Sequence, residues 1–266
     1  MRYLLPLLLA VTLRAGVVSD TNFLDRLYLD VLNRSPGPPD LSFGLTYLGT
    51  PGDTRQGLAL YLLGSNEYRG DLVTSYYQSY LSRTPQTSDV NAFLTEFTGG
   101  ATDEQVQAQI LGSLEYFGDT GGTNAQYITA LYLRLLGRMP SGTDVSNWQT
   151  FLATQPRQDM ATNLLGSAEY LDLLVGGYYQ SYLNRIPSSF EFSPFVNQIQ
   201  GGGTNELVQS EILGSTEFYA DAQPAAVPEP ASYYETAAAV ALLWLVRRRR
   251  TGPASRHSAD PGHVRA

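Results

Sequence analysis

The sequence predicts an all-α protein made of tandem helical repeats, with four units of roughly three short helices arranged as two similar halves. Two motifs each occur four times along the chain, and repeats of roughly fifty residues are typical of stacked helical units. Apolar residues recur in pairs four positions apart, which is the spacing of one face of a helix. No comparable stretch alternates apolar and polar residues with the period of two that indicates a half-buried strand.

The first helix of each unit is predicted from the apolar pairs. These run over residues 23–32, 72–81, 127–136 and 174–183. We expect the proline that follows each run to end the helix, because the residue before a proline is pushed out of the α region. The 18 tyrosines concentrate on these helices, where we expect core packing. An exposed tyrosine surface for carbohydrate or protein contacts is the alternative.

The second and third helices of each unit are predicted to be short. The second carries an aromatic residue ten positions after a repeated arginine, namely Phe93, Trp148 or Phe195 in units two to four. The third begins at a cap, which is clearest where the run from Thr102 to Gln105 has the pattern of a capping box.

The first repeated motif is an arginine with a proline two residues later and an acid six residues later. Its arginine–acid pairs are Arg34 and Asp40, Arg83 and Asp89, Arg138 and Asp144, and Arg185 and Glu191. An arginine at the C-terminus of one helix and an acid at the N-terminus of the next both interact favourably with the helix dipoles. We therefore interpret each pair as a structural clamp at a helix corner, with a ligand-binding pair as the alternative.

The second repeated motif is Leu-Gly-Ser-x-Glu followed by an aromatic residue. Its glutamates are Glu67, Glu115, Glu169 and Glu217, and its glycines are Gly64, Gly112, Gly166 and Gly214. We expect each glutamate to make a helix-terminal or interhelical hydrogen bond, although glycosidases also use paired acids. We place the glycines inside the third helix, where glycine is less favourable than alanine by about 1 kcal/mol. We expect the close approach of a neighbouring helix to offset this cost.

The repeats divide the body into two halves. Units one and three resemble each other, as do units two and four, where the stretch 76–81 recurs as 178–183. Half 1 is assigned to residues 20–121 and half 2 to residues 122–222.

Composition excludes several kinds of chemistry from the body. Between Asp20 and Ala222, 22 carboxylates and nine arginines give a formal charge of −13, which disfavours nucleic-acid binding. The chain has no lysine and no cysteine, which excludes Schiff-base chemistry, a Walker-type loop and thiolate sites. Its two histidines, His257 and His263, lie beyond the body. We therefore predict no catalytic residue, no cofactor and no metal site.

The N-terminal residues resemble a secretory signal peptide. Arg2 precedes an apolar run from Tyr3 to Leu13, which is long enough for the central region of such a peptide. The small residues before Asp20 provide a cleavage site, so we assign the signal peptide to residues 1–19. Export of the body is the expected consequence.

The C-terminal residues have the order of a sorting tail. A linker at residues 223–232 precedes a short transmembrane segment at 233–246 and a basic cytoplasmic tail at 247–266. The key residues are Val227, Pro228, Glu229 and Pro230, with Arg247, Arg248, Arg249 and Arg250. The four arginines favour the cytoplasmic side of a membrane. The segment gives about 21 Å of helix against roughly 30 Å of hydrocarbon, which suits a transient anchor; a short core helix is the alternative.

This tail resembles the PEP-CTERM signal of Gram-negative bacteria, which a membrane protease of the exosortase class recognises. The resemblance implies export, anchoring in the inner membrane during transit, and release to the cell surface or the extracellular matrix. Exosortase is then the processing partner, and the C-terminal segment contacts the membrane.

The body carries a second resemblance, in residues 27–36, 131–140 and 166–170 together with Trp148. Residues 22–220 are similar to the bacterial domain-of-unknown-function family 4214, which is itself similar to the helical linker domain of phycobilisomes. The chain departs from the family in lacking its usual Asp-x-x-Gly-Leu after the proline. The resemblance implies no catalytic residue.

We therefore expect an exported, non-enzymatic structural or interaction protein of the cell envelope or extracellular polymer matrix, with exopolysaccharide or other surface proteins as partners. A polysaccharide-binding or polysaccharide-modifying surface protein is the first alternative. A phycobilisome-type linker is a disfavoured third, because the signal peptide and the acidic body oppose it.

Overall fold

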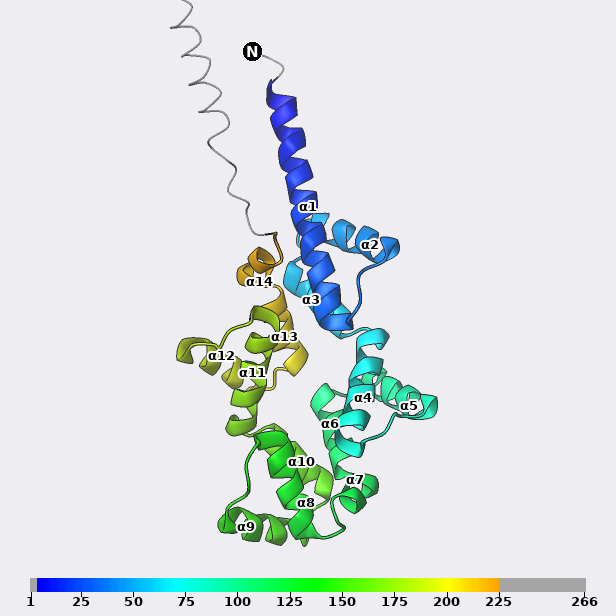
Figure 1. Cartoon of the computed structure of the whole chain (residues 1–266), viewed down its shortest axis with the longest axis vertical. Helices are drawn as coiled ribbons and strands as arrows, with labels where there is room; N and C mark the ends of the chain where they lie inside the picture. The colour runs from blue at the N-terminus through cyan, green and yellow to red at the C-terminus, as the bar shows by residue number, and fades with distance from the viewer. Residues whose placement is uncertain (1–3, 225–266) are drawn as a thin grey trace, which may run out of the picture. The chain divides into compact units, whose positions relative to one another are not determined.

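The computed structural model describes residues 4–224, with side chains from Gly16 onward, and within this range the chain is helical without any strand (Figure 1). The all-α prediction is confirmed. The first half of the described chain contains α1 (Leu4–Leu32), α2 (Pro38–Gly49), α3 (Arg55–Leu63), α4 (Asn66–Leu81), α5 (Thr87–Thr98), α6 (Asp103–Gly112) and α7 (Leu114–Asp119). The second contains α8 (Asn124–Leu131), the π-helical segment η1 (Tyr132–Leu136), α9 (Gly142–Leu152), α10 (Arg157–Leu165), α11 (Ala168–Leu183), α12 (Ser189–Gln200), α13 (Asn205–Leu213) and α14 (Thr216–Asp221).

Each repeat is a long helix followed by two short ones. The long helices are α1, α4, the continuous pair α8–η1, and α11. The second helices are α2, α5, α9 and α12, and the third are α3, α6, α10 and α13. The short helix α7 is separated from α8 by Gly121 and Gly122, whose positive φ values of 106° and 72° suit glycine.

The long helices end at a left-handed residue, which corrects the prediction that proline ends them. Asn33, Ser82, Gly137 and Asn184 have φ values between 50° and 66°, and each lies three residues before the proline. At two of these ends the backbone N–H of the arginine donates a hydrogen bond to a carbonyl in the last turn of the helix. Arg83 donates to Tyr77, and Arg185 donates to Tyr179. This is the Schellman pattern of a helix C-terminus.

The Leu-Gly-Ser-x-Glu motif forms a junction between two helices, so three of its four glycines lie just past the third helix rather than inside it. Gly64, Gly166 and Gly214 follow the last residue of α3, α10 and α13, and Gly112 is the last residue of α6. The serine then caps the next helix by accepting a backbone N–H three residues ahead, as Ser65 does from Tyr68 at 3.2 Å.

Close approach of a neighbouring helix occurs at two of the four glycines. A Cβ on Gly112 would lie 2.6 Å from Cα of Gln158, and a Cβ on Gly214 would lie 2.5 Å from Cα of Gln56. At Gly166 it would meet only carbonyl oxygens of its own helix, at 3.5 Å or more. The two close glycines lie where α6 packs against α10 and where α13 packs against α3.

The third helices therefore pair between the sequence halves. Core A contains buried residues of α1, α3 and α11–α14, and core B contains those of α4–α8, η1 and α10. Each core combines helices from half 1 with helices from half 2. The last repeat contacts the first. The ring of Phe218 packs edge-on against that of Phe23, with centroids 6.0 Å apart. Figure 1 shows α14 and α13 beside α1.

Helix α1 runs without a break through the predicted cleavage point before Asp20. None of the helices within residues 4–224 has both the length and the apolar character that a membrane-spanning helix needs. The PEP-CTERM motif, the segment 233–246 and the arginines from Arg247 to Arg250 lie outside the described residues. Their roles stay predictions.

Candidate functional site: arginine clamps and a tyrosine-lined cavity

Each repeated arginine lies against its acid six residues later. The shortest N···O distances are 2.7 Å for Arg34–Asp40, 3.6 Å for Arg83–Asp89, 3.6 Å for Arg138–Asp144 and 2.6 Å for Arg185–Glu191. Each acid also accepts the backbone N–H at the start of its helix, as Asp144 does from Ser141 at 2.8 Å. The acid therefore caps one helix while pairing with the end of the previous one.

The same arginine makes its main contact with the repeated glutamate. Arg185 donates from Nε and Nη2 to the two carboxylate oxygens of Glu217 at 2.5 and 2.7 Å, a bidentate pair. Equivalent pairs join Arg34 to Glu67, Arg83 to Glu115 and Arg138 to Glu169. A hydrogen bond for each glutamate is predicted from the sequence, but its partner is not, although the two motifs recur with separations of 31 to 33 residues.

A tyrosine ring completes each group. The guanidinium carbon of Arg83 lies 4.7 Å from the ring centroid of Tyr77, and that of Arg185 lies 4.9 Å from Tyr179. Arg34 and Arg138 lie over Tyr28 and Tyr132 in the same way. We call each set of arginine, glutamate, acid and tyrosine an arginine clamp. The arginine side chains are 34% to 44% exposed, so the clamps lie at the surface.

The clamps lower the pKa values of their four repeated glutamates. The hydrogen bond from Arg138 lowers the pKa of Glu169, and the other three repeated glutamates are lowered by the same cause. The pKa of Glu191 falls to about 2, because Arg185 and the Ser188 backbone both favour its ionised form. A general acid needs a raised pKa at neutral pH, so these carboxylates are poorly suited to that role.

A second feature is a cavity of about 460 Å³ between α4, α6, α11 and α13. Six half-buried tyrosines line it from equivalent positions of the two halves: Tyr68, Tyr76 and Tyr80 on α4, and Tyr170, Tyr178 and Tyr182 on α11. We call it the tyrosine cavity. Burial raises the pKa values of all six hydroxyls.

Two buried glutamines fix the tyrosine hydroxyls. Gln107 donates from Nε2 to the hydroxyl of Tyr80 at 2.6 Å. Gln209 donates to Tyr178 at 3.1 Å and accepts from Tyr182 at 2.9 Å. The rings of Tyr178 and Tyr182 are nearly parallel, with an interplanar angle of 14°. The walls of the cavity are therefore held in place before any ligand enters.

Asp103 and Asn205 occupy equivalent positions in this cavity, as the first residues of α6 and α13. They are 3% and 5% exposed. The carboxyl group of Asp103 is hydrogen-bonded to that of Glu206, and Oδ1 of Asn205 has no hydrogen-bond partner among the described residues. Burial raises the pKa of Asp103 to about 9, and the neighbouring carboxyl groups of Glu206 and Glu104 add to this effect while Arg69 opposes it. The adjacent carboxyl groups of Asp103 and Glu206 therefore hold a proton more strongly than a free carboxyl group does.

Asp103 and Asn205 are not among the site residues predicted from the sequence. From the sequence, Asp103 is identified only as part of the capping pattern that starts the third helix. The available signal was the change from Asp to Asn at equivalent positions of two otherwise similar halves.

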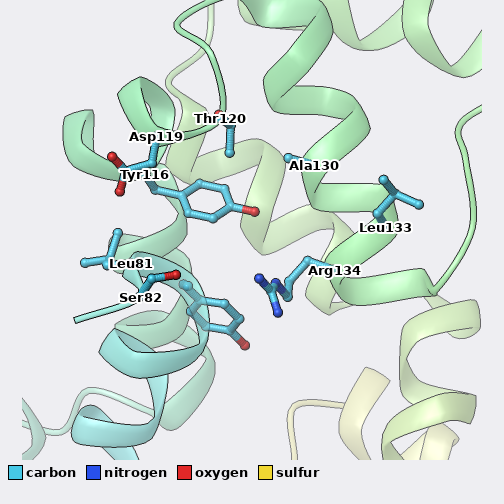
Figure 2. A pocket seen from close by; sticks show the side chains of 9 residues that line it. Leu81, Ser82, Tyr116, Asp119, Thr120, Ala130, Leu133 and Arg134 are labelled. Carbon is cyan, nitrogen blue, oxygen red and sulfur yellow. The ribbon is translucent and has the colours of Figure 1, made fainter. Parts of the chain in front are cut away.

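A neighbouring hollow of about 600 Å³ adjoins the tyrosine cavity through Tyr80, which lines both. Figure 2 shows Tyr116 of α7 and Arg134 of η1 reaching into it from two sides. The guanidinium carbon of Arg134 lies 5.9 Å from the ring centroid of Tyr80. This hollow provides a comparison site with a positive charge.

Part of the body matches a known family. No curated protein and no solved structure matches the chain. Residues 108–174, which run from within α6 into α11, match the family described as "Domain of unknown function (DUF4214)". This match bears out the family resemblance for that stretch, whereas the PEP-CTERM and phycobilisome likenesses stay predictions. The segment that contains the Arg138 clamp is thus similar to DUF4214, a family whose function is unknown.

Proposed function

We propose that the protein is an exported, exosortase-sorted, non-enzymatic structural or interaction protein of the cell envelope or the extracellular polymer matrix. The observation that carries the non-enzymatic part is that the repeated acids are engaged by arginines. Each arginine binds one glutamate and one further acid, and these pairs recur in all four repeats. Carboxylates distributed in this way hold helices together.

The polysaccharide-modifying alternative would need two convergent carboxyl groups with different pKa values. The clamp glutamates lie in four separate repeats, and their lowered pKa values favour the ionised form. Polysaccharide binding without modification is compatible with the tyrosine cavity. A phycobilisome-type linker remains disfavoured by the acidic body and the expected signal peptide.

Export and processing are tested by mass spectrometry of the surface and secreted fractions. We expect a body that begins near Asp20 and ends near Pro230. This expectation rests on Arg2 and the apolar run after it at the N-terminus, and on the Pro-Glu-Pro motif followed by the arginine cluster near the C-terminus. Recovery of the intact chain, with His263 included, from the soluble cytoplasm would remove this part of the proposal.

The non-enzymatic part is tested by complementation of a gene deletion. We expect the deletion to alter aggregation, biofilm cohesion or retention of matrix polymer. A folded variant with Glu67, Glu115, Glu169 and Glu217 changed to Gln should restore the phenotype. A control with the same change in charge replaces four exposed acids outside the clamps by Asn: Asp53, Asp71, Asp172 and Asp221.

One pair of results would contradict the non-enzymatic reading. The folded glutamine variant would fail to restore the phenotype while its asparagine control succeeds, and the wild-type chain would hydrolyse a matrix polysaccharide in vitro. The polysaccharide-modifying reading would then replace ours.

A further inference from the structure

The starts of α6 and α13 meet at the boundary between the two halves of the body. Asp103 of α6 and Glu206 of α13 are 3% and 7% exposed, and their carboxyl groups are hydrogen-bonded to each other. The equivalent contact in the repeat joins Glu104 to Asn205, whose backbone N–H donates to Oε1 of the glutamate at 3.1 Å. We call these two contacts together the acid seam.

One contact of the acid seam needs a proton and the other does not. An ionised carboxyl group only accepts hydrogen bonds, so Asp103 and Glu206 can bond to each other only while one of them is protonated. Without that proton, two negative charges lie side by side in a buried position, which strongly disfavours ionisation of both. The backbone N–H of Asn205, in contrast, donates at any pH.

Other charged and titratable groups act on the carboxyl pair from α4, α6 and α11. They are Arg69, Tyr68 and Tyr76 of α4, Glu104 of α6 and Tyr178 of α11. Arg69 favours the ionised form of Asp103, whereas Glu104 opposes it. Burial raises the pKa values of the three tyrosines well above 10, so their hydroxyls stay neutral while the carboxyl pair titrates.

The acid seam can open without disrupting the main packing of its helices. Helix α6 packs mainly against α10, and α13 packs mainly against α3. The carboxyl pair also lies between two hollows. Asp103 lines the tyrosine cavity, and Glu206 lines a hollow of about 310 Å³ together with Arg69. A small separation of the two helix starts therefore admits water to both carboxyl groups.

We propose that the acid seam is a proton-dependent latch between the two halves of the body. With one shared proton, the bond between Asp103 and Glu206 joins the start of α6 to the start of α13. When hydroxide removes that proton, the pair carries two negative charges, the helix starts separate, and water enters between them. Because the pKa of Asp103 is raised to about 9, the latch is closed at neutral pH and opens as the pH rises through 9.

This inference goes beyond the proposed function, because a structural protein of the matrix can act with its two halves permanently joined. The latch also does not depend on export, since all of its residues belong to the body. Localisation experiments and experiments on the latch therefore fail independently of each other.

The first test follows the protons of the pair. Carbon-13 NMR of the full chain, from pH 4 to 10.5, records the carboxyl carbons of Asp103 and Glu206. We expect one alkaline step that appears at both residues, because two strongly interacting groups titrate as a pair. Complete ionisation of both carboxyl groups at pH 7 would overturn the proposal.

The second test measures the opening itself. The methyl groups of Val106 and Val208 lie in the first turns of α6 and α13, and those of Leu111 and Leu213 lie near the other ends; all four residues are 0% exposed. A soluble, neutral gadolinium chelate relaxes methyl groups that solvent can reach. Between pH 6 and 10, relaxation at the two valines should rise about threefold or more through local opening. The two leucines should not change.

Two variants keep the bond without the shared proton. In Asp103→Asn the side-chain amide donates to the Glu206 carboxylate, and in Glu206→Gln the new amide donates to Asp103. Both variants should keep the first turns protected at pH 10. The matched control is Glu104→Gln, which removes a neighbouring charge but keeps the acceptor oxygen of the second contact. It should still open in alkali.

Several results would contradict the latch. An equal rise at the valines and the leucines would indicate unfolding of the whole body, and no rise at the valines would mean a closed seam. Opening in the amide variants as in the wild type would show that the carboxyl pair does not hold the helix starts together. Loss of opening in Glu104→Gln would assign the titration to that residue. Circular dichroism checks folding, and either amide variant alone is sufficient for the comparison.

Discussion

At the scale of single residues, Asp103 and Glu191 are two carboxyl groups that the fold shifts in opposite directions. Asp103 is buried beside other acids, and its pKa rises to about 9. Glu191 accepts hydrogen bonds from Arg185 and from a helix start, and its pKa falls to about 2. Because the pKa of each group in the folded protein differs from its value in the unfolded chain, each group makes stability depend on pH, but in separate pH ranges and with opposite sign.

The first prediction concerns Asp103 above neutrality. The folded state holds one more proton than the unfolded state between the unfolded pKa of about 4 and the folded pKa of about 9. Stability should therefore fall as pH rises through this range. Asp103→Asn should remove most of this slope and stabilise the protein at pH 8 by about 1 to 3 kcal/mol. Urea unfolding from pH 5 to 9 measures both. An equal slope in the wild type and the variant would contradict the assignment.

A second prediction concerns Glu191 in acid. Its pKa is lowered by folding, so the stability that it contributes is present above the unfolded pKa of 4.5 and is lost as pH falls towards 2. Glu191→Gln should lose stability at pH 6 and should show a shallower decline below pH 5. Asp172→Asn, an exposed acid outside the clamps, serves as the control. Unfolding by urea between pH 2 and 6 provides the measurement, and a steeper decline in Glu191→Gln would count against the clamp.

At the scale of helices, the glycines of the repeated junction have two different roles. Gly112 and Gly214 lie in the contact between third helices of different halves, where the backbone of the facing helix leaves no room for a methyl group. Gly166 ends a helix without such a neighbour. The same sequence motif therefore contains glycine for packing in two copies, whereas a helix end alone accounts for it in the others.

This difference gives a third prediction. Gly112→Ala should destabilise the fold by about 1 to 3 kcal/mol, because the added methyl group forces α6 away from α10. Gly166→Ala should be nearly neutral, within about 0.5 kcal/mol. Thermal and urea unfolding of the two variants make the comparison. Equal effects at the two positions would show that the close contact is absent in solution.

The sequence predicted the helical class and the repeated pairs well, because both depend on local spacing. The placement of Arg138 six residues before Asp144 sets a helix end against a helix start within one short segment. The pairing of α6 with α10 was not predictable in this way, since it joins two helices with similar apolar faces from different halves. Asp103 was missed for a related reason, because its burial depends on α13 and α4 rather than on its neighbours in sequence.

At the scale of the whole molecule, the body behaves as two interlocked halves. Residues up to Gln223 form one compact unit, and both of its cores draw helices from each half. The contact of Phe23 with Phe218 closes the array. Stability should therefore reside in the association of the halves more than in either half alone.

The fourth prediction follows from this arrangement. Half 1, residues 20–121, should not form a stable folded monomer, because α3 and α6 lose their partners α13 and α10. Half 2, residues 122–222, should behave likewise. An equimolar mixture should recover helical structure as a one-to-one complex, observed by circular dichroism and by size-exclusion chromatography with light scattering. A folded monomer of half 1 at micromolar concentration would disprove the interlocked arrangement.

The pairing of α6 with α10 and of α13 with α3 has a consequence for symmetry. Two identical half-chains assembled in this way would form a symmetric dimer, in which every contact across the axis occurs twice. Such a dimer must have the same residue at both copies of every position. The covalent link between α7 and α8 removes this restriction, and the equivalent first residues of α6 and α13 are Asp103 and Asn205. A single chain can therefore place an ionisable group at one of two equivalent positions and a permanently neutral amide at the other.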